Sequence, residues 1–233
     1  MSRVPDVTVG EKPAYLAVPV GSPGPWPGVV VIHEAFGLNA DIRGHADRLA
    51  ALGYLALAPD LYDGRSWLRC IRGMIRQLHA GSGPAFDALD ACRGWLAERA
   101  DCTGKTGVIG FCMGGGFALL CAPRGQYGAA AVNYGEVPSD AEAVLAGSCP
   151  VVASYGGRDP MGTKAPKQLE AALTALGVPH DVKAYPSAGH SFMSPKPAPM
   201  APLAALTRMG YDKEAAEDAW QRIFAFFGRH LRD

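Results

Sequence analysis

The sequence of 233 residues has no excess of acidic or basic residues, because 22 lysines and arginines balance 22 aspartates and glutamates. Proteins that bind nucleic acids or anionic membranes need a cationic surface, so this balance argues against both kinds of partner. No apolar stretch reaches the roughly 20 residues of a membrane-spanning helix. Residues 1–13 also lack the apolar core of a signal peptide. We therefore expect a cytoplasmic protein that binds neither membranes nor nucleic acids.

Closely paired cysteines are missing as well. The six cysteines are scattered along the chain, and no C-x-x-C motif occurs. Structural zinc sites usually draw on closely spaced cysteines and histidines, and stable disulfides are rare in the cytoplasm. We therefore expect reduced thiols, no metal site and no cofactor.

Short apolar runs alternate with longer amphipathic stretches. Continuously apolar runs of strand length are typical of parallel strands that are covered on both faces. The alternation predicts an α/β fold, a single domain over residues 1–233 with a mostly parallel sheet and helices on both faces. The expected strands span 28–33, 54–58, 106–110, 129–134, 151–155 and 181–185, the last near an edge, after an antiparallel start at 7–9 and 15–18. The expected helices span 42–52, 84–100, 113–122, 163–176 and 213–231.

A glycine-rich turn joins the expected strand 106–110 to the expected helix 113–122. Residues 110–114 read GFCMG, which is G-x-C-x-G, and no G-x-S-x-G occurs in the chain. In such a turn the central residue has strained backbone angles and projects above the sheet, and the residues two positions away must be small. The positive end of the following helix favours a thiolate there. Cys112 is therefore a candidate nucleophile, although a buried cysteine in an ordinary turn also fits this motif.

Two polar residues follow later strands of the expected sheet. Asp159 comes after strand 151–155, and His190 comes after strand 181–185. Taken singly, the aspartate suits a turn and the histidine is ambiguous. Nucleophile, acid and histidine follow one another in the chain order of α/β-hydrolases, each beyond the carboxyl end of a strand. Together they predict a catalytic triad of Cys112, Asp159 and His190.

Five motifs give the chain a resemblance to the dienelactone hydrolase family of α/β-hydrolases. The cysteine in the turn is the most specific feature, and the motifs span most of the chain. The resemblance implies the α/β-hydrolase fold, a small ester or lactone as substrate, and a monomer or weak homo-oligomer. The motifs are HEAFGL at 33–38, APDLY at 58–62, GFCMGG at 110–115, GGRD at 156–159 and AGHSF at 188–192.

The resemblance also implies roles for individual residues. It assigns Cys112 as nucleophile, with Asp159 and His190 as its acid and histidine. The family has a glutamate after an early strand, and Glu34 matches it. That glutamate would hold the resting cysteine as a neutral thiol and take its proton when substrate binds. A plainer interpretation is that Glu34 caps the helix that begins near Asn39.

The chemistry expected of these groups is acyl transfer. A thiolate attacks the ester carbonyl, and two backbone amides stabilise the resulting oxyanion. By the family pattern these amides belong to Ala35 and Met113. His190 would protonate the leaving oxygen and then activate water against the thioester, while Asp159 orients the imidazole.

Substrate recognition departs from the family pattern. Well-studied members hold a substrate carboxylate with two arginines, and one of these positions is Ser194 here. The other has several candidates, some of them at helical spacing, which form either an anion clamp or a solvated face. These candidates are Arg65, Arg69, Arg72 and Arg76. The residues that we expect to contact substrate are Phe36, Trp67, Arg69, Arg72, Tyr134 and Phe192, although the aromatic ones suit a core equally well.

Two further residues have plain structural interpretations. His33 is expected to be a satisfied histidine at a strand end, and Cys121 is expected to pack in the core. Two other functions remain open, namely a thioesterase on the same fold and a non-catalytic binding protein. A peptidase is disfavoured because the chain has no spare length for the domain that usually builds its cleft.

Overall fold

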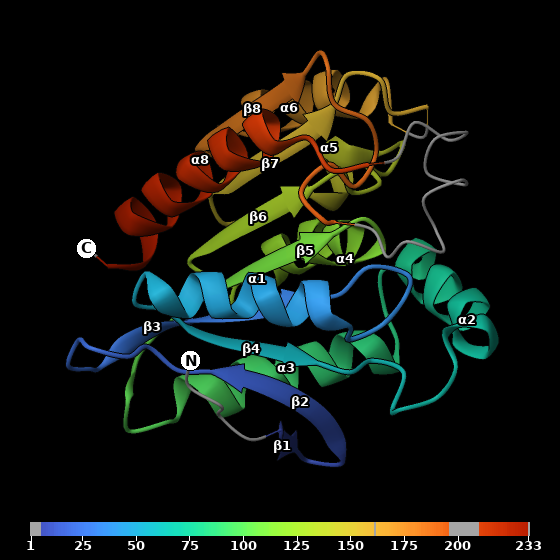
Figure 1. Ribbon diagram of the computed structural model, residues 1–233. Coiled ribbons are helices and arrows are strands. Elements are labelled where there is room, and N and C mark those ends of the chain that lie inside the picture. The colour runs from blue at the N-terminus through green and yellow to red at the C-terminus, as the bar shows by residue number, and fades with distance from the viewer. Residues whose placement is uncertain (1–5, 161, 196–209, 233) are drawn as a thin grey trace.

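The computed structural model describes residues 6–160, 162–195 and 210–232, and its centre is an eight-stranded sheet (Figure 1). The strand order is β1-β2-β4-β3-β5-β6-β7-β8. The first two strands pair antiparallel at one edge, and the other six are parallel to one another. The strands are β1 Asp6–Val9, β2 Lys12–Ala17, β3 Trp26–Ile32, β4 Leu55–Pro59, β5 Cys102–Phe111, β6 Ala129–Asn133, β7 Val151–Gly156 and β8 His180–Tyr185.

Helices cover both faces of this sheet. On one face lie α1 (Ala40–Ala51) and α8 (Lys213–Leu231), which run across the front in Figure 1. On the other face lie α3, α4 and α6, with α2 and α5 packed beside them. None of the helices within the described ranges is long and apolar enough to cross a membrane. The helices of the second face are α2 Trp67–Ala80, α3 Pro84–Ala97, α4 Met113–Cys121, α5 Ala141–Val144 and α6 Ala165–Ala175.

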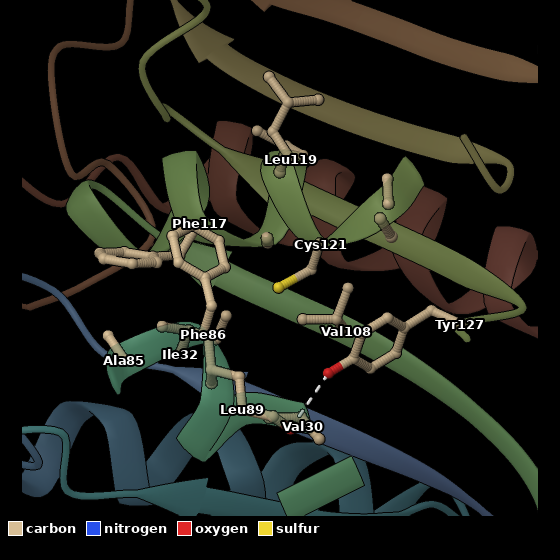
Figure 2. Packing of buried hydrophobic residues seen from close by; sticks show 14 of the residues in the cluster. Val30, Ile32, Ala85, Phe86, Leu89, Val108, Phe117, Leu119, Cys121 and Tyr127 are labelled. Carbon is tan, nitrogen blue, oxygen red and sulfur yellow. Dashed lines mark hydrogen bonds between the residues drawn. The ribbon is translucent and has the colours of Figure 1, made fainter. Parts of the chain in front are cut away.

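Each face of the sheet has its own apolar core. One core packs Ile42 of α1 and Trp220 of α8 against the strands. The other contains Phe86, Phe117 and Cys121, which lie together in Figure 2. The prediction that Cys121 belongs to the core is therefore confirmed, and burial raises the pKa of its thiol to about 12. All six cysteines of the chain are free thiols.

The predicted α/β-hydrolase architecture is confirmed, including the antiparallel start and the edge position of β8. The ends of several helices and strands differ by a few residues from those expected from the sequence. The expected strand 129–134 ends one residue early, because Tyr134 has a left-handed backbone with φ of 42°. The expected helix 42–52 begins at Ala40, because the side chain of Asn39 accepts a hydrogen bond from the amide of Ile42 and caps it. The short helix α5 carried no recognisable sequence signal.

Candidate active site

The turn between β5 and α4 forces Cys112 into a strained conformation, with φ of 55° and ψ of −118°. The two flanking glycines allow this turn to pack. A Cβ on Gly110 would lie 1.9 Å from the carbonyl oxygen of Gly114, and a Cβ on Gly114 would lie 2.4 Å from that of Ile32. The amide of Cys112 donates to the carbonyl of Asn133 at 3.0 Å, which ties the turn to β6. The predicted tight turn is therefore confirmed.

The structure brings Cys112, Asp159 and His190 together, although 78 residues separate the cysteine from the histidine. The ring Nε2 of His190 lies 3.0 Å from the Sγ of Cys112. Its Nδ1 lies 2.7 Å from the carboxylate Oδ2 of Asp159. Only 2% of Asp159 and 3% of His190 is exposed, so the carboxylate and the imidazole interact away from water.

The contact with Asp159 changes the protonation of His190. Burial alone would lower the pKa of the imidazole. The hydrogen bonds to Asp159 and Cys112, together with their negative charges, outweigh burial and raise that pKa to about 10. These contacts favour the protonated form of the imidazole, which can act as an acid.

The loop after β3 carries Glu34, and His33 fixes the backbone of that loop. The amide of Leu61 donates to Nε2 of His33, so the other ring nitrogen carries the proton and donates to the carbonyl of Glu34 at 2.7 Å. Burial lowers the pKa of His33, which keeps this ring neutral. The structural interpretation of His33 is therefore confirmed. The cap of α1 is Asn39 and not Glu34.

The Glu34 side chain is buried, with 2% of the residue exposed. The hydroxyl of Tyr134 donates to its Oε1 at 3.4 Å. The same tyrosine ring meets the His190 ring edge-on, with centroids 5.3 Å apart. Glu34 thus lies within the same cluster of side chains as the cysteine and the histidine.

The backbone at Ala35 and Met113 borders the same space. Met113 is the first residue of α4, so its amide has no acceptor within the helix. The hydroxyl of Tyr62 donates to the carbonyl of Ala35 at 2.8 Å and holds the loop at the peptide after the Ala35 amide. Both residues line a cavity of about 720 Å³ together with Cys112 and His190.

One wall of this cavity is apolar. It comes from Ile71, Ile75 and Leu78, which are spaced to share one face of α2. Val137, in the loop after β6, also lines the cavity. This wall was not predicted from the sequence, although the spacing of residues 71, 75 and 78 indicates one apolar helix face. Lys164, at the start of α6, adds a cationic side chain.

Comparisons with known proteins identify the family of this chain. The sequence profile of the family described as "Dienelactone hydrolase family" matches residues 13–231. The chain belongs to the dienelactone hydrolase family. It is a hydrolase that acts on ester bonds.

Individual relatives cover nearly the whole chain. A Yersinia pestis protein named "Putative carboxymethylenebutenolidase" is 31% identical over 94% of this chain and 84% of its own length. A solved structure described as a dienelactone hydrolase-like promiscuous phosphotriesterase from metagenomic libraries is 27% identical, covers 97% of this chain and 96% of its own, and has a TM-score of 0.78. The dienelactone hydrolase of Anabaena variabilis is 23% identical over 97% of this chain and 96% of its own, with a TM-score of 0.69, and shows the shared fold.

Only one of the six residues expected to contact substrate is among the described residues that line the cavity. Tyr134 lines it, whereas the other five expected residues are not among the described lining residues. Phe192 is fully buried in the core beside α8, and Phe36 packs edge-on against Trp67. Contact of these residues with a substrate stays a prediction. The other residues outside the lining are Arg69 and Arg72.

The arginine positions of the dienelactone hydrolase family look different here. Arg65, Arg69, Arg72 and Arg76 are all exposed. Arg65 pairs with Asp63 at 2.7 Å. On α2 the other three lie on the side away from the apolar wall, as the spacing of a helix requires. This arrangement favours the solvated face over the anion clamp.

Proposed function

We propose that this protein hydrolyses small esters or lactones through the thiolate of Cys112, by way of a thioester acyl-enzyme. The observation that carries the proposal is the 3.0 Å contact between Cys112 Sγ and His190 Nε2 at the wall of a cavity. The strained turn aims the sulfur away from the sheet, and the start of α4 favours negative charge on it. A cysteine with a histidine partner and an orienting carboxylate is an arrangement suited to nucleophilic catalysis.

The first step of the proposed reaction needs a base other than His190, because His190 is protonated. The hydrogen bond and charge of Asp159 raise the pKa of His190. In this proposal they keep His190 protonated beside the neutral thiol, so His190 is a poor base for it. Glu34 is the second base in this proposal. The S–H bond of Cys112 breaks, the proton forms an O–H bond with the Glu34 carboxylate, and the sulfur attacks the carbonyl carbon. The amides of Ala35 and Met113 stabilise the oxyanion.

Collapse of the oxyanion breaks the bond to the leaving oxygen, which takes the proton of His190. The neutral imidazole then removes a proton from water, and the hydroxide attacks the thioester carbon. The C–S bond breaks, and the proton on Glu34 returns to the sulfur of Cys112. The cycle consumes one water and releases an acid and an alcohol, with both bases back in their starting states.

The apolar wall of α2 favours a substrate with an aliphatic or aromatic group on one side of its ester. Ile71 and Leu78 offer that group a dry surface, and each buried CH₂ contributes about 0.8 kcal/mol. A panel of neutral and anionic esters, lactones and thioesters measures this preference. A phosphotriester belongs in the panel, because one similar structure is described as a phosphotriesterase.

Removal of the thiol tests the proposal directly. In Cys112→Ala we expect hydrolysis of an activated aryl ester to fall by at least about 1,000-fold. Cys102→Ala removes a partly buried thiol at the far end of β5 and serves as the matched control. Mass spectrometry of the quenched wild-type reaction is expected to show an acyl adduct on Cys112. Turnover by Cys112→Ala at the wild-type rate would rule the proposal out.

A further inference from the structure

A row of buried polar side chains leads away from Glu34 towards α1. The hydroxyl of Tyr134 lies 3.4 Å from Glu34 Oε1 and 3.4 Å from the Oγ of Ser194. Ser194 Oγ in turn lies 3.0 Å from Nε2 of His45. The four residues come from four separate segments, and each is at most 6% exposed. Polar groups buried to this extent are kept where they satisfy one another.

Packing holds the far end of this row in place. The His45 ring stacks on the Phe111 ring, with centroids 4.3 Å apart and planes 19° from parallel. Phe111 is the residue immediately before the candidate nucleophile. The amide of Tyr134 donates to the carbonyl of Ser154 at 2.7 Å, which fixes the tyrosine against β7. The row is therefore anchored to the strands that build the active site.

The number of protons that each group can donate determines the direction of these hydrogen bonds. Burial, followed by the charge of Glu34, raises the pKa of Tyr134, so its phenol keeps its proton. An ionised carboxylate can only accept, and each hydroxyl has one proton to donate. Only one set of donor directions makes all three contacts hydrogen bonds. His45 donates to Ser194, Ser194 donates to Tyr134, and Tyr134 donates to Glu34.

A protonated Glu34 reverses part of this order. Its new O–H can donate to the Tyr134 oxygen, and the tyrosine proton then turns to Ser194. The serine oxygen can accept from both neighbours, because a hydroxyl has two lone pairs, while its own proton turns away from Tyr134. Rotation of hydroxyl groups is sufficient, so no proton has to leave the row.

We propose that Tyr134, Ser194 and His45 are positioning residues that hold the Glu34 carboxylate in place as proton acceptor and adapt to both of its protonation states. The proposal rests on the proposed role of Glu34 in the reaction. It assigns a use to Ser194, which occupies a position where the family pattern has an arginine, and to His45, which the sequence analysis did not single out.

A double-mutant cycle with Glu34 tests this proposal. Ser194→Ala removes one hydroxyl, and we expect kcat for a neutral aryl ester to fall about 3- to 10-fold with KM nearly unchanged. We expect Tyr134→Phe to lower kcat about 10-fold or more, since it removes the bond to the carboxylate itself. In a Glu34→Gln background we expect either substitution to change kcat by less than about 2-fold, because the group they act through is gone.

A second readout covers variants that turn over too slowly to measure. The rate at which iodoacetamide alkylates Cys112 reports on removal of the thiol proton, and it needs no turnover. We expect Ser194→Ala and Tyr134→Phe to lower this rate when Glu34 is present and to leave it nearly unchanged in the Glu34→Gln background. His45→Gln retains an N–H donor and is expected to keep more activity than His45→Leu.

The matched control is Tyr155→Phe. Tyr155 is buried in the core on the opposite face, and its hydroxyl has no hydrogen-bond partner in the described chain. We expect this variant to match the wild type in both assays. If Ser194→Ala and Tyr134→Phe act by the same factor in both backgrounds, they affect the fold alone and the positioning role is overturned. That outcome leaves Cys112→Ala inactive, so it is distinguishable from a failure of the proposed function.

Discussion

Asp159 is the group whose removal tests the proposed acid role of His190 most sharply. Asp159→Asn keeps the shape of the side chain and removes its charge. The pKa of His190 would then fall from about 10 towards its ordinary value of 6.5. If the pKa falls fully to 6.5, the protonated fraction of the imidazole at about pH 8 drops to about 3%, which is at most about a 30-fold loss of the acid. At about pH 6 the same change would cost less than 2-fold.

The assay is kcat/KM for a neutral ester between about pH 6 and pH 8. Asparagine also orients the imidazole less well, which adds a loss that is independent of pH. We therefore expect the ratio of wild-type to variant activity to grow across this range, by up to roughly 20-fold. Asp87→Asn, at an exposed position of α3, is the control. A defect of the same size at both ends of the range would show that a raised pKa of His190 plays no part in catalysis.

Three further predictions concern stability. Gly114→Ala places a Cβ 2.4 Å from the carbonyl oxygen of Ile32, and we expect urea denaturation to show a loss of about 2 kcal/mol or more; an unchanged midpoint would contradict the tight packing of the turn. Ser191→Gly relieves a φ of 55° and removes a buried hydroxyl without a partner in the described chain, so we expect a gain of about 1 kcal/mol in thermal unfolding, and a lower melting temperature would refute this. Because the folded pKa of His190 is raised, its protonation stabilises the fold below pH 6.5 and this contribution is lost as the pH rises towards about 10. The stability difference from His190→Gln should therefore shrink over that range, and a constant difference would exclude the coupling.

The strands and most helices could be predicted because their signals are local. The helix α8 spans Lys213–Leu231 as expected, since Asp212 caps its first turn and its apolar residues repeat at helical spacing. The strand β5 begins four residues earlier than expected, at Cys102, in a stretch that is largely exposed. Burial on both faces was the criterion for a strand, so a segment that extends into solvent escaped it.

The triad could be predicted because its order along the chain and its place beyond strand ends are visible in the sequence. The contact between His45 and Ser194 joins residues 149 positions apart, and neither lies in a motif. The apolar wall of α2 shows as spacing, but spacing alone does not tell which face meets a cavity. Contacts of this kind depend on how the loops pack above the sheet, which the sequence pattern leaves undetermined.

Backbone strain connects the fold with the proposed chemistry. Of the four described non-glycine residues with positive φ, three lie at the site: Cys112 at 55°, Tyr134 at 42° and Ser191 at 55°. A left-handed backbone costs such residues roughly 1–2 kcal/mol each. The hydrogen bonds that the backbone amides of Cys112 and Tyr134 donate to β6 and β7 offset part of that cost. The parallel sheet therefore does more than bring distant residues together, because hydrogen bonds to its strands stabilise the strained backbone from which Cys112 contacts His190 and Tyr134 contacts Glu34.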